Sequence, residues 1–287
     1  MLRKHARQLR AFTLLELVVV LMILAALAGL VISQVAQLGR TTDMAYSAKT
    51  SSDIAENLQM HFVLQKRYPT NMDSLLVGDS ANPGAVPTGV YVPDDADSDG
   101  NQDTGLPDSG PHLDRALVAG QLTNGGHRSF RRSGFDTLVD HVRGADNTAN
   151  SNESATIVRA ISNAATDFFA LVDTTTTNSD AQRILRQVYP STLGVAGAGL
   201  YSLPDDVEAL VAVGIGPRNS AVPETMLNAP IYPGNDGSYY GHYVAIFACF
   251  RSGERAVLVG VCDSYGRLNR YAIEQFNESL PNKQRRG

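Results

Sequence analysis

The sequence has few basic residues, and they are not arranged to suit nucleic acid. Lysine and arginine together number 24, against 29 aspartates and glutamates, so the net charge is −5. A phosphate backbone is bound by clustered lysine and arginine, often beside aromatic rings on which bases stack. The one basic cluster comprises Arg128, Arg131 and Arg132 and has no aromatic neighbour beyond Phe130. We therefore expect no binding of nucleic acid.

The sequence also lacks recognisable catalytic motifs. It contains no His-Glu-x-x-His, no Gly-x-Ser-x-Gly and no Cys-x-x-Cys pattern. Its six histidines are scattered, and none has the spacing of a metal-ligand pair. We therefore predict that the chain is not an enzyme and that it requires no cofactor. A membrane-tethered enzyme is the least favoured of the alternatives.

One long apolar run stands near the N-terminus. From Phe12 to Ile32 the sequence is FTLLELVVVLMILAALAGLVI, and only Thr13 and Glu16 interrupt it. About 20 apolar residues in a helix are long enough to cross a bilayer. The leader before the run carries bases at positions 3, 4, 7 and 10, which orient such a helix with its N-terminus in the cytoplasm. We predict a transmembrane helix over residues 12–33, placing the chain in the cytoplasmic (inner) membrane with its later residues in the periplasm.

Glu16 is the exception within this run. A carboxylate deep in an apolar span costs about 2.5 kcal/mol or more unless it has a partner. The run itself offers no basic partner, so Glu16 is expected to pair with a group from elsewhere.

The residues Arg10-Ala11-Phe12-Thr13-Leu14-Leu15-Glu16 supply one explanation. They resemble the prepilin cleavage and methylation motif of type IV pilins and type II secretion pseudopilins. The resemblance implies that a prepilin peptidase removes residues 1–11 between Ala11 and Phe12 and methylates the new amine of Phe12. It also implies that Glu16 pairs with the N-terminal amine of a neighbouring subunit. Two features depart from the family: Ala11 stands where glycine is usual, and no proline precedes Pro69.

A soluble helical segment is predicted after the apolar run, over residues 34–68. Apolar residues recur there mostly every three or four positions, which predicts a stripe that packs on the rest of the chain. The stripe comprises Met44, Ala48, Ile54, Leu58 and Phe62. The helix should end at Tyr68-Pro69, because proline disfavours helix in the residue before it. The segment from Lys66 to Thr70 also resembles the pseudopilin helix end, after which a short helix is expected near Leu75.

The region from residue 78 to 110 is rich in glycine, proline and acidic residues. Aspartates alternate there before a glycine, a pattern similar to calcium-binding loops. The candidate ligands are Asp95, Asp97, Asp99 and Asp103. Leu106 occupies the twelfth position, where an EF-hand has a glutamate, so a full EF-hand is not expected. A structural calcium site and a plain acidic turn both remain open.

The later part of the chain contains mixed signals. Helices are predicted over 135–142 and 180–188, and another near 202–206 before a strand at 210–215. Two apolar strands, 243–248 and 256–261, flank a turn and predict a β-hairpin, with a last element at 271–276. Because both hairpin strands are apolar on both faces, one face should pack on the long helix and the other under further cover.

The two cysteines, Cys249 and Cys262, stand near the ends of this hairpin. In the predicted register they lie very roughly 14–20 Å apart at strand rise, whereas a disulfide needs Cα atoms within about 7 Å. We predict two buried free thiols.

Together these patterns predict an α+β fold in which a long N-terminal helix, half transmembrane and half soluble, packs on a C-terminal antiparallel sheet. A large mixed insertion separates the two within an extracytoplasmic domain over 69–287. The expected function is that of a structural, pseudopilin-like subunit of a type II secretion or type IV pilus-like fibre. Its partners would be other pilin subunits, the prepilin peptidase and an inner-membrane assembly platform. The alternative is a minor, tip-located or adhesin-like pilin whose insertion binds a partner or an exported substrate.

Overall fold

The computed structural model describes most of the chain in several stretches. These are residues 14–79, 89–90, 113, 116–143, 155–174, 178–189, 202–232 and 241–269. The chain divides into two compact units, Met1–Asp43 and Met44–Gly287. The second unit contains the sheet and three of the four helices in the described residues.

Helix α1 comprises Leu14–Gln65, 52 residues that include no proline. It ends where the backbone of Lys66 turns into the left-handed region, with φ of 60°. Tyr68 and Pro69 follow outside any helix or strand, in agreement with the expected end of the helix before the proline. The side chains of α1 are described from Leu17 to Gly29 and from Thr42 onward.

The predicted membrane location is contradicted. Over the residues that the structure describes, no helix combines the length and the apolar character needed to cross a bilayer. Two predictions are therefore wrong. They are the transmembrane half of the helix, residues 12–33, and the single-pass location in the cytoplasmic membrane.

The second half of α1 packs on its own domain through the predicted apolar stripe. Ala48, Ile54 and Leu58 are buried, and Phe62 is partly buried against the same core. This part of the prediction is confirmed. Burial of these side chains supplies most of the attachment of the helix, since polar residues occupy much of its opposite side.

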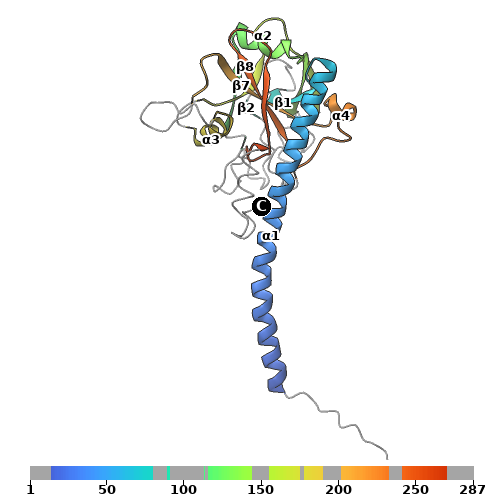
Figure 1. Ribbon diagram of the computed structural model, residues 1–287, viewed down its shortest axis with the longest axis vertical. Coiled ribbons are helices and arrows are strands. Elements are labelled where there is room, and N and C mark those ends of the chain that lie inside the picture. Colours follow the sequence, from blue (N-terminus) through green and yellow to red (C-terminus); the bar gives the residue numbers. More distant parts are fainter. Residues whose placement is uncertain are drawn as a thin grey trace, which may run out of the picture. The chain divides into compact units, whose positions relative to one another are not determined.

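The remaining elements follow in the second unit (Figure 1). The strands form one nine-stranded sheet in which β3, β6, β7, β1, β4 and β5 are successive neighbours, β2 pairs with β1, and β8 lies between β7 and β9. The strands are β1 (Met72–Asp79), β2 (Gly89–Val90), β3 (Leu117–Gln121), β4 (Thr137–Arg143), β5 (Ala155–Ala160), β6 (Phe168–Val172), β7 (Val207–Gly214), β8 (Val244–Phe250) and β9 (Val257–Cys262). The helices are α2 (Asn124–Arg132), α3 (Ser179–Val188) and α4 (Ala221–Glu224).

The predicted fold class is wrong. The sheet is neither confined to the C-terminal part nor antiparallel throughout, because β1 and β4 pair in parallel. Strands β1 to β6 come from the region predicted to be a large mixed insertion between the helix and the sheet, and they are hydrogen-bonded into the same sheet as β7 to β9. The protein is therefore a mixed α/β structure in which that region supplies much of the sheet.

Several local predictions are also corrected. The segment predicted as a helix over 135–142 is mostly strand β4, and the segment at 202–206 contains no helix. Leu75 lies in β1 and not in a short helix, and its φ of 59° marks the irregular pairing of that strand with β4. The last predicted element, 271–276, lies outside the described residues.

Other local predictions are confirmed. Helix α3 forms where the apolar spacing predicts it. Its N-cap is Asn178, whose side chain accepts a hydrogen bond from the backbone N–H of Ala181. The strand predicted at 210–215 lies largely within β7, and the predicted hairpin is β8 and β9.

The central strands are buried on both faces. In β8, Ala245, Phe247 and Cys249 belong to one core cluster, which also contains Ile54 and Leu58 of α1. The alternate residues Val244, Ile246 and Ala248 belong to a second cluster with Ala181, Ile184 and Leu185 of α3. The prediction that the long helix covers one face and other structure covers the second face is confirmed.

Both cysteines are free and buried, as predicted. Cys249 pairs across the sheet with Ala209, and Cys262 pairs with Val244, so the two thiols lie near opposite ends of the hairpin. Burial raises the pKa of both thiols well above its usual value, which favours the uncharged and unreactive form.

The contact between α1 and the sheet can be tested with two leucines on that helix. Leu58 is fully buried, whereas Leu64 is 67% exposed. We expect Leu58→Ala to lower the free energy of unfolding by roughly 2–5 kcal/mol, because it leaves a cavity in the core. Leu64→Ala should change it by no more than about 0.5 kcal/mol. Urea unfolding followed by circular dichroism measures both, and equal effects would contradict the described packing.

Candidate functional site

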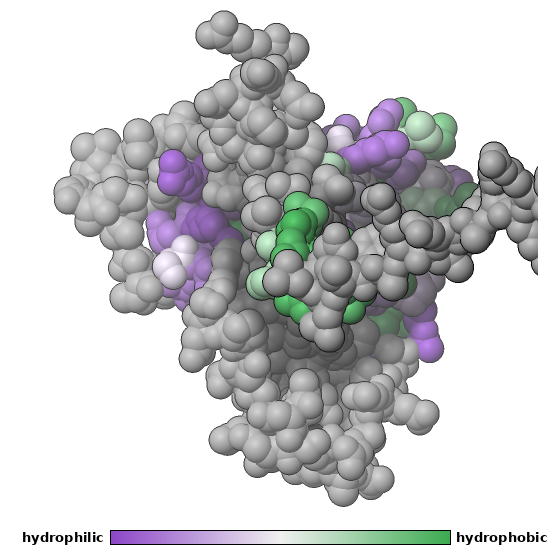
Figure 2. Space-filling view, turned by 90° about the horizontal axis from the view of Figure 1, so that it is seen from below, coloured by the Kyte–Doolittle hydropathy of each residue, from purple (hydrophilic) through white to green (hydrophobic). Residues whose placement is uncertain are grey.

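The longest run of exposed apolar side chains in the described residues lies near the start of α1. Nine large apolar side chains there are 42–62% exposed. They are Leu17, Val18, Val19, Val20, Leu21, Met22, Ile23, Leu24 and Leu27, and we call them the apolar stretch. Figure 2 shows hydrophobic residues gathered in green on the face that it presents. Contiguous apolar surface of this kind marks a site of interaction.

The apolar stretch has no polar side. From Leu17 to Leu24 every residue is a large aliphatic or methionine, so successive residues point in all directions around the helix axis. A helix that is hydrophobic all round is stable only when it is surrounded on several sides. The stretch therefore requires more than one neighbour.

The residues predicted from the pilin-like motif lie before or close to the first residue that the structure describes, Leu14. Ala11 and Phe12 are outside the described residues. Glu16 lies in α1, one position before the apolar stretch, but its side chain is outside the description. The predicted calcium ligands Asp95, Asp97, Asp99 and Asp103 are also outside it. In the part of the chain that is described, no group of three or more histidine, cysteine, aspartate or glutamate side chains could hold a metal ion.

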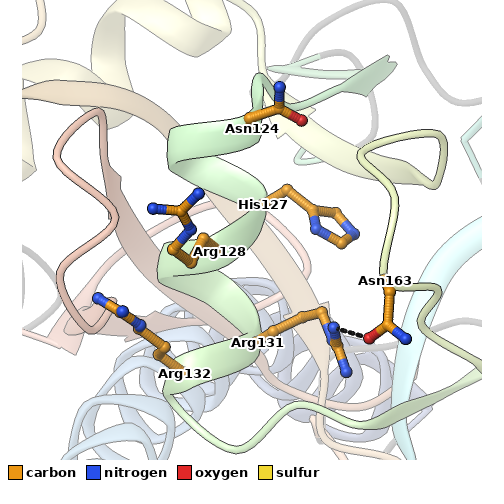
Figure 3. A pocket seen from close by; sticks show the side chains of 6 residues that line it. All are labelled: Asn124, His127, Arg128, Arg131, Arg132 and Asn163. Carbon is orange, nitrogen blue, oxygen red and sulfur yellow. Dashed lines mark hydrogen bonds between the residues drawn. The ribbon is translucent and has the colours of Figure 1, made fainter.

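A pocket of about 350 Å³ lies beside α2 and was not predicted from the sequence. It is lined by Asn124, His127, Arg128, Arg131 and Arg132 of α2, together with Asn163 after β5. Figure 3 shows Arg128 and Arg132 on one side of the helix, and His127, Arg131 and Asn163 on the other. The side chain of Arg131 donates a hydrogen bond to Asn163 Oδ1. The sequence shows the arginines but not the loop that completes the pocket.

His127 is held by a carboxylate beneath this pocket. Its Nε2 lies 3.1 Å from Oδ2 of Asp167, and both side chains are largely buried. The same carboxylate accepts hydrogen bonds from the backbone N–H of Ser162 and from Arg159, which also pairs with Asp140. Because Asp167 is saturated with donors from three segments, the network fixes α2 against β5 and β6.

Two further polar contacts fix the second half of α1. His61 is buried, with Nδ1 donating to the carbonyl of Arg67 at 3.0 Å and Nε2 3.1 Å from Oε2 of Glu224. The hydroxyl of Ser47 donates to Oδ2 of Asp263 at 3.2 Å, joining the helix to the loop after β9. The contacts of His61 with Glu224 and of Ser47 with Asp263 link α1 to segments more than 150 residues away in the sequence.

Asp263 is the centre of the second contact and is completely buried. Its carboxylate accepts from Arg267, whose Nη2 lies 2.7 Å from Oδ2, and from the backbone N–H groups of Tyr265 and Arg267. Arg267 also donates to the hydroxyl of Tyr232 at 2.9 Å. Burial raises the pKa of Tyr232 to about 12, against the opposing effect of Arg267, so this hydroxyl stays protonated at neutral pH.

Neutralising Asp263 should destabilise the domain. We expect Asp263→Asn to lower the free energy of unfolding by about 3 kcal/mol or more, because it leaves the buried guanidinium of Arg267 without its counter-charge. Asp53→Asn is the matched control, since Asp53 is exposed on α1, and it should have an effect within about 0.5 kcal/mol. Urea denaturation of both variants gives the comparison, and a silent Asp263→Asn would refute the role of this ion pair.

Comparisons with known proteins returned no matching family model, no matching curated protein and no matching solved structure.

Proposed function

We propose that this chain is a structural subunit, similar to type IV pilins and type II secretion pseudopilins, that assembles into a fibre through its N-terminal helix. The observation that carries the proposal is the apolar stretch, in which nine exposed side chains surround the helix without a polar side. Packing the same stretch from several copies together would remove this surface from water. At about 25 cal/mol per Å² of apolar surface, such burial is a substantial driving force.

The motif at residues 10–16 supports this proposal independently. A carboxylate at Glu16 would be enclosed when helices pack around it, and it would then require a positive partner. The amine of Phe12 on a neighbouring copy, exposed after cleavage behind Ala11, supplies that charge. The proposed partners are therefore further subunits of the same kind and a prepilin peptidase. In this role the chain performs no catalysis and requires no cofactor, and calcium at Asp95, Asp97, Asp99 and Asp103 stays a prediction.

A second candidate is a minor subunit, placed at the tip of the fibre, that binds a partner. The pocket beside α2 favours it, because an open polar pocket has no role in packing helices. The two candidates differ in abundance: a main subunit would be present along the whole fibre.

Processing can be tested directly. In cells that contain a prepilin peptidase, the mature chain should begin at Phe12 and carry one added methyl group on its amine. Intact mass and N-terminal sequencing of the purified protein measure both. A mature chain that begins at Met1 would contradict the proposed motif.

Assembly can be tested with two glutamates on the same helix. We expect Glu16→Ala to reduce incorporation into fibres by about tenfold, because the amine of the neighbouring copy loses its partner, a loss on the order of 1.4 kcal/mol. Glu56→Ala is the control, since Glu56 is an exposed glutamate of α1 outside the apolar stretch. Quantitative crosslinking of fibres from cells compares them. Equal incorporation of the two variants would reject the role of Glu16.

A further inference from the structure

Helix α2 concentrates positive charge on an otherwise acidic protein. Asn124, Arg128 and Arg132 are spaced by four residues, and His127 and Arg131 lie beside them, so all five border the same pocket. Arg128 and Arg132 are exposed and Arg131 is half-buried. Three guanidinium groups therefore lie within about two turns of one helix, in a chain whose net charge is −5.

Three other arginines of the domain have carboxylate partners. Arg159 pairs with Asp140 and Asp167, Arg183 with Asp180, and Arg267 with Asp263. Among the residues that the structure describes, no carboxylate forms an ion pair with Arg128, Arg131 or Arg132. Arg131 and Arg132 donate instead to neutral oxygens, those of the Asn163 side chain and the Gly253 carbonyl. Nε of Arg131 is buried and has no hydrogen-bond partner among the residues that the structure describes.

The helix that carries them is firmly placed. Both oxygens of the Glu208 carboxylate accept hydrogen bonds at its N-terminus, from Thr123 and from the backbone N–H of Gly126. A Cβ at Gly126 would lie 2.7 Å from that carboxylate, which would then have to shift. Glu208 thus already neutralises the positive end of the helix. Attraction for a further anion must come from the arginine side chains.

We propose that the pocket beside α2 is a binding site for an acidic peptide segment, one whose consecutive aspartate or glutamate side chains pair with Arg128, Arg131 and Arg132. Guanidinium groups bind carboxylates through paired hydrogen bonds, so several of them around one pocket suit a segment with several carboxylates. The open pocket of about 350 Å³ accommodates several carboxylate side chains along the helix. A nucleic acid fits less well, because none of the lining residues is a tyrosine, phenylalanine or tryptophan on which a base could stack. This proposal is the same whether the chain is a main or a minor subunit of the fibre.

The test uses the full chain and a fluorescent hexaglutamate peptide. We expect saturable binding, measured by fluorescence anisotropy, that weakens as salt rises. Arg128→Glu/Arg132→Glu should weaken it by at least about tenfold, because two attractive contacts become repulsive. Arg186→Glu is the matched control, an exposed arginine in the last turn of α3, and it should change binding by less than about twofold.

A second variant tests whether weaker binding comes from the lost charge or from a loss of the fold. Arg128→Glu alone leaves the hydrogen bond from Arg132 to Gly253 intact, and it should still weaken the peptide by several-fold, with an unchanged near-ultraviolet circular dichroism spectrum. Absence of peptide binding, or equal losses in the Arg186→Glu control, would overturn the proposal. Binding of inorganic phosphate or citrate but not of hexaglutamate would assign the pocket to a small anion instead. Tighter, Arg128-dependent binding of a DNA oligonucleotide would assign it to nucleic acid.

Discussion

The position of one aromatic side chain, Tyr68, determines how the domain is put together. It follows the end of α1 by three residues, and its ring packs against Phe62 at 4.6 Å, Phe247 at 4.7 Å and Phe135 at 5.7 Å between centroids. Its hydroxyl accepts a hydrogen bond from the backbone N–H of Leu258 in β9. The helix, the segment before β4 and both strands of the hairpin therefore meet at one ring. Aromatic pairs of this geometry add to the stabilisation from burial alone. Phe135 extends the cluster to Phe130 of α2, at 4.1 Å, so the basic helix is placed by the same core.

Local patterns were sufficient to predict some elements and insufficient for others. Helix α3 and the hairpin of β8 and β9 could be predicted because their signals, apolar spacing and two apolar runs around a turn, lie within a few residues. The segment from Phe135 to Val142 has helical spacing but forms a strand, because Val139 pairs with Val158 on one side and Asp73 on the other. Pairings between segments so far apart leave no trace in a local window. The parallel pairing of β1 with β4 was missed for the same reason, and with it the true class of the sheet.

The apolar stretch and the pocket beside α2 also differ in how far the sequence alone predicts them. The apolar stretch is evident from the sequence, since its composition alone reveals it. The sequence also shows Arg128, Arg131 and Arg132, but not that they have no ion pair with any carboxylate of the described residues, because that depends on where those carboxylates lie. Asp167 pairs with His127 and Arg159, and Glu208 accepts hydrogen bonds at the start of α2. Only the folded arrangement separates the arginines that stabilise the domain from those that remain available to a ligand.

The burial of both thiols has a practical consequence for chemical labelling. Cys249 and Cys262 are the only cysteines of the chain, and each is enclosed within the sheet. The folded protein thus offers no native thiol to a maleimide or to an oxidant, and copies cannot be joined covalently through their own cysteines. One cysteine introduced at an exposed position would then be the single reactive thiol, with the native pair left in place. Distances between neighbouring copies, or between a copy and its ligand, become measurable without altering the core.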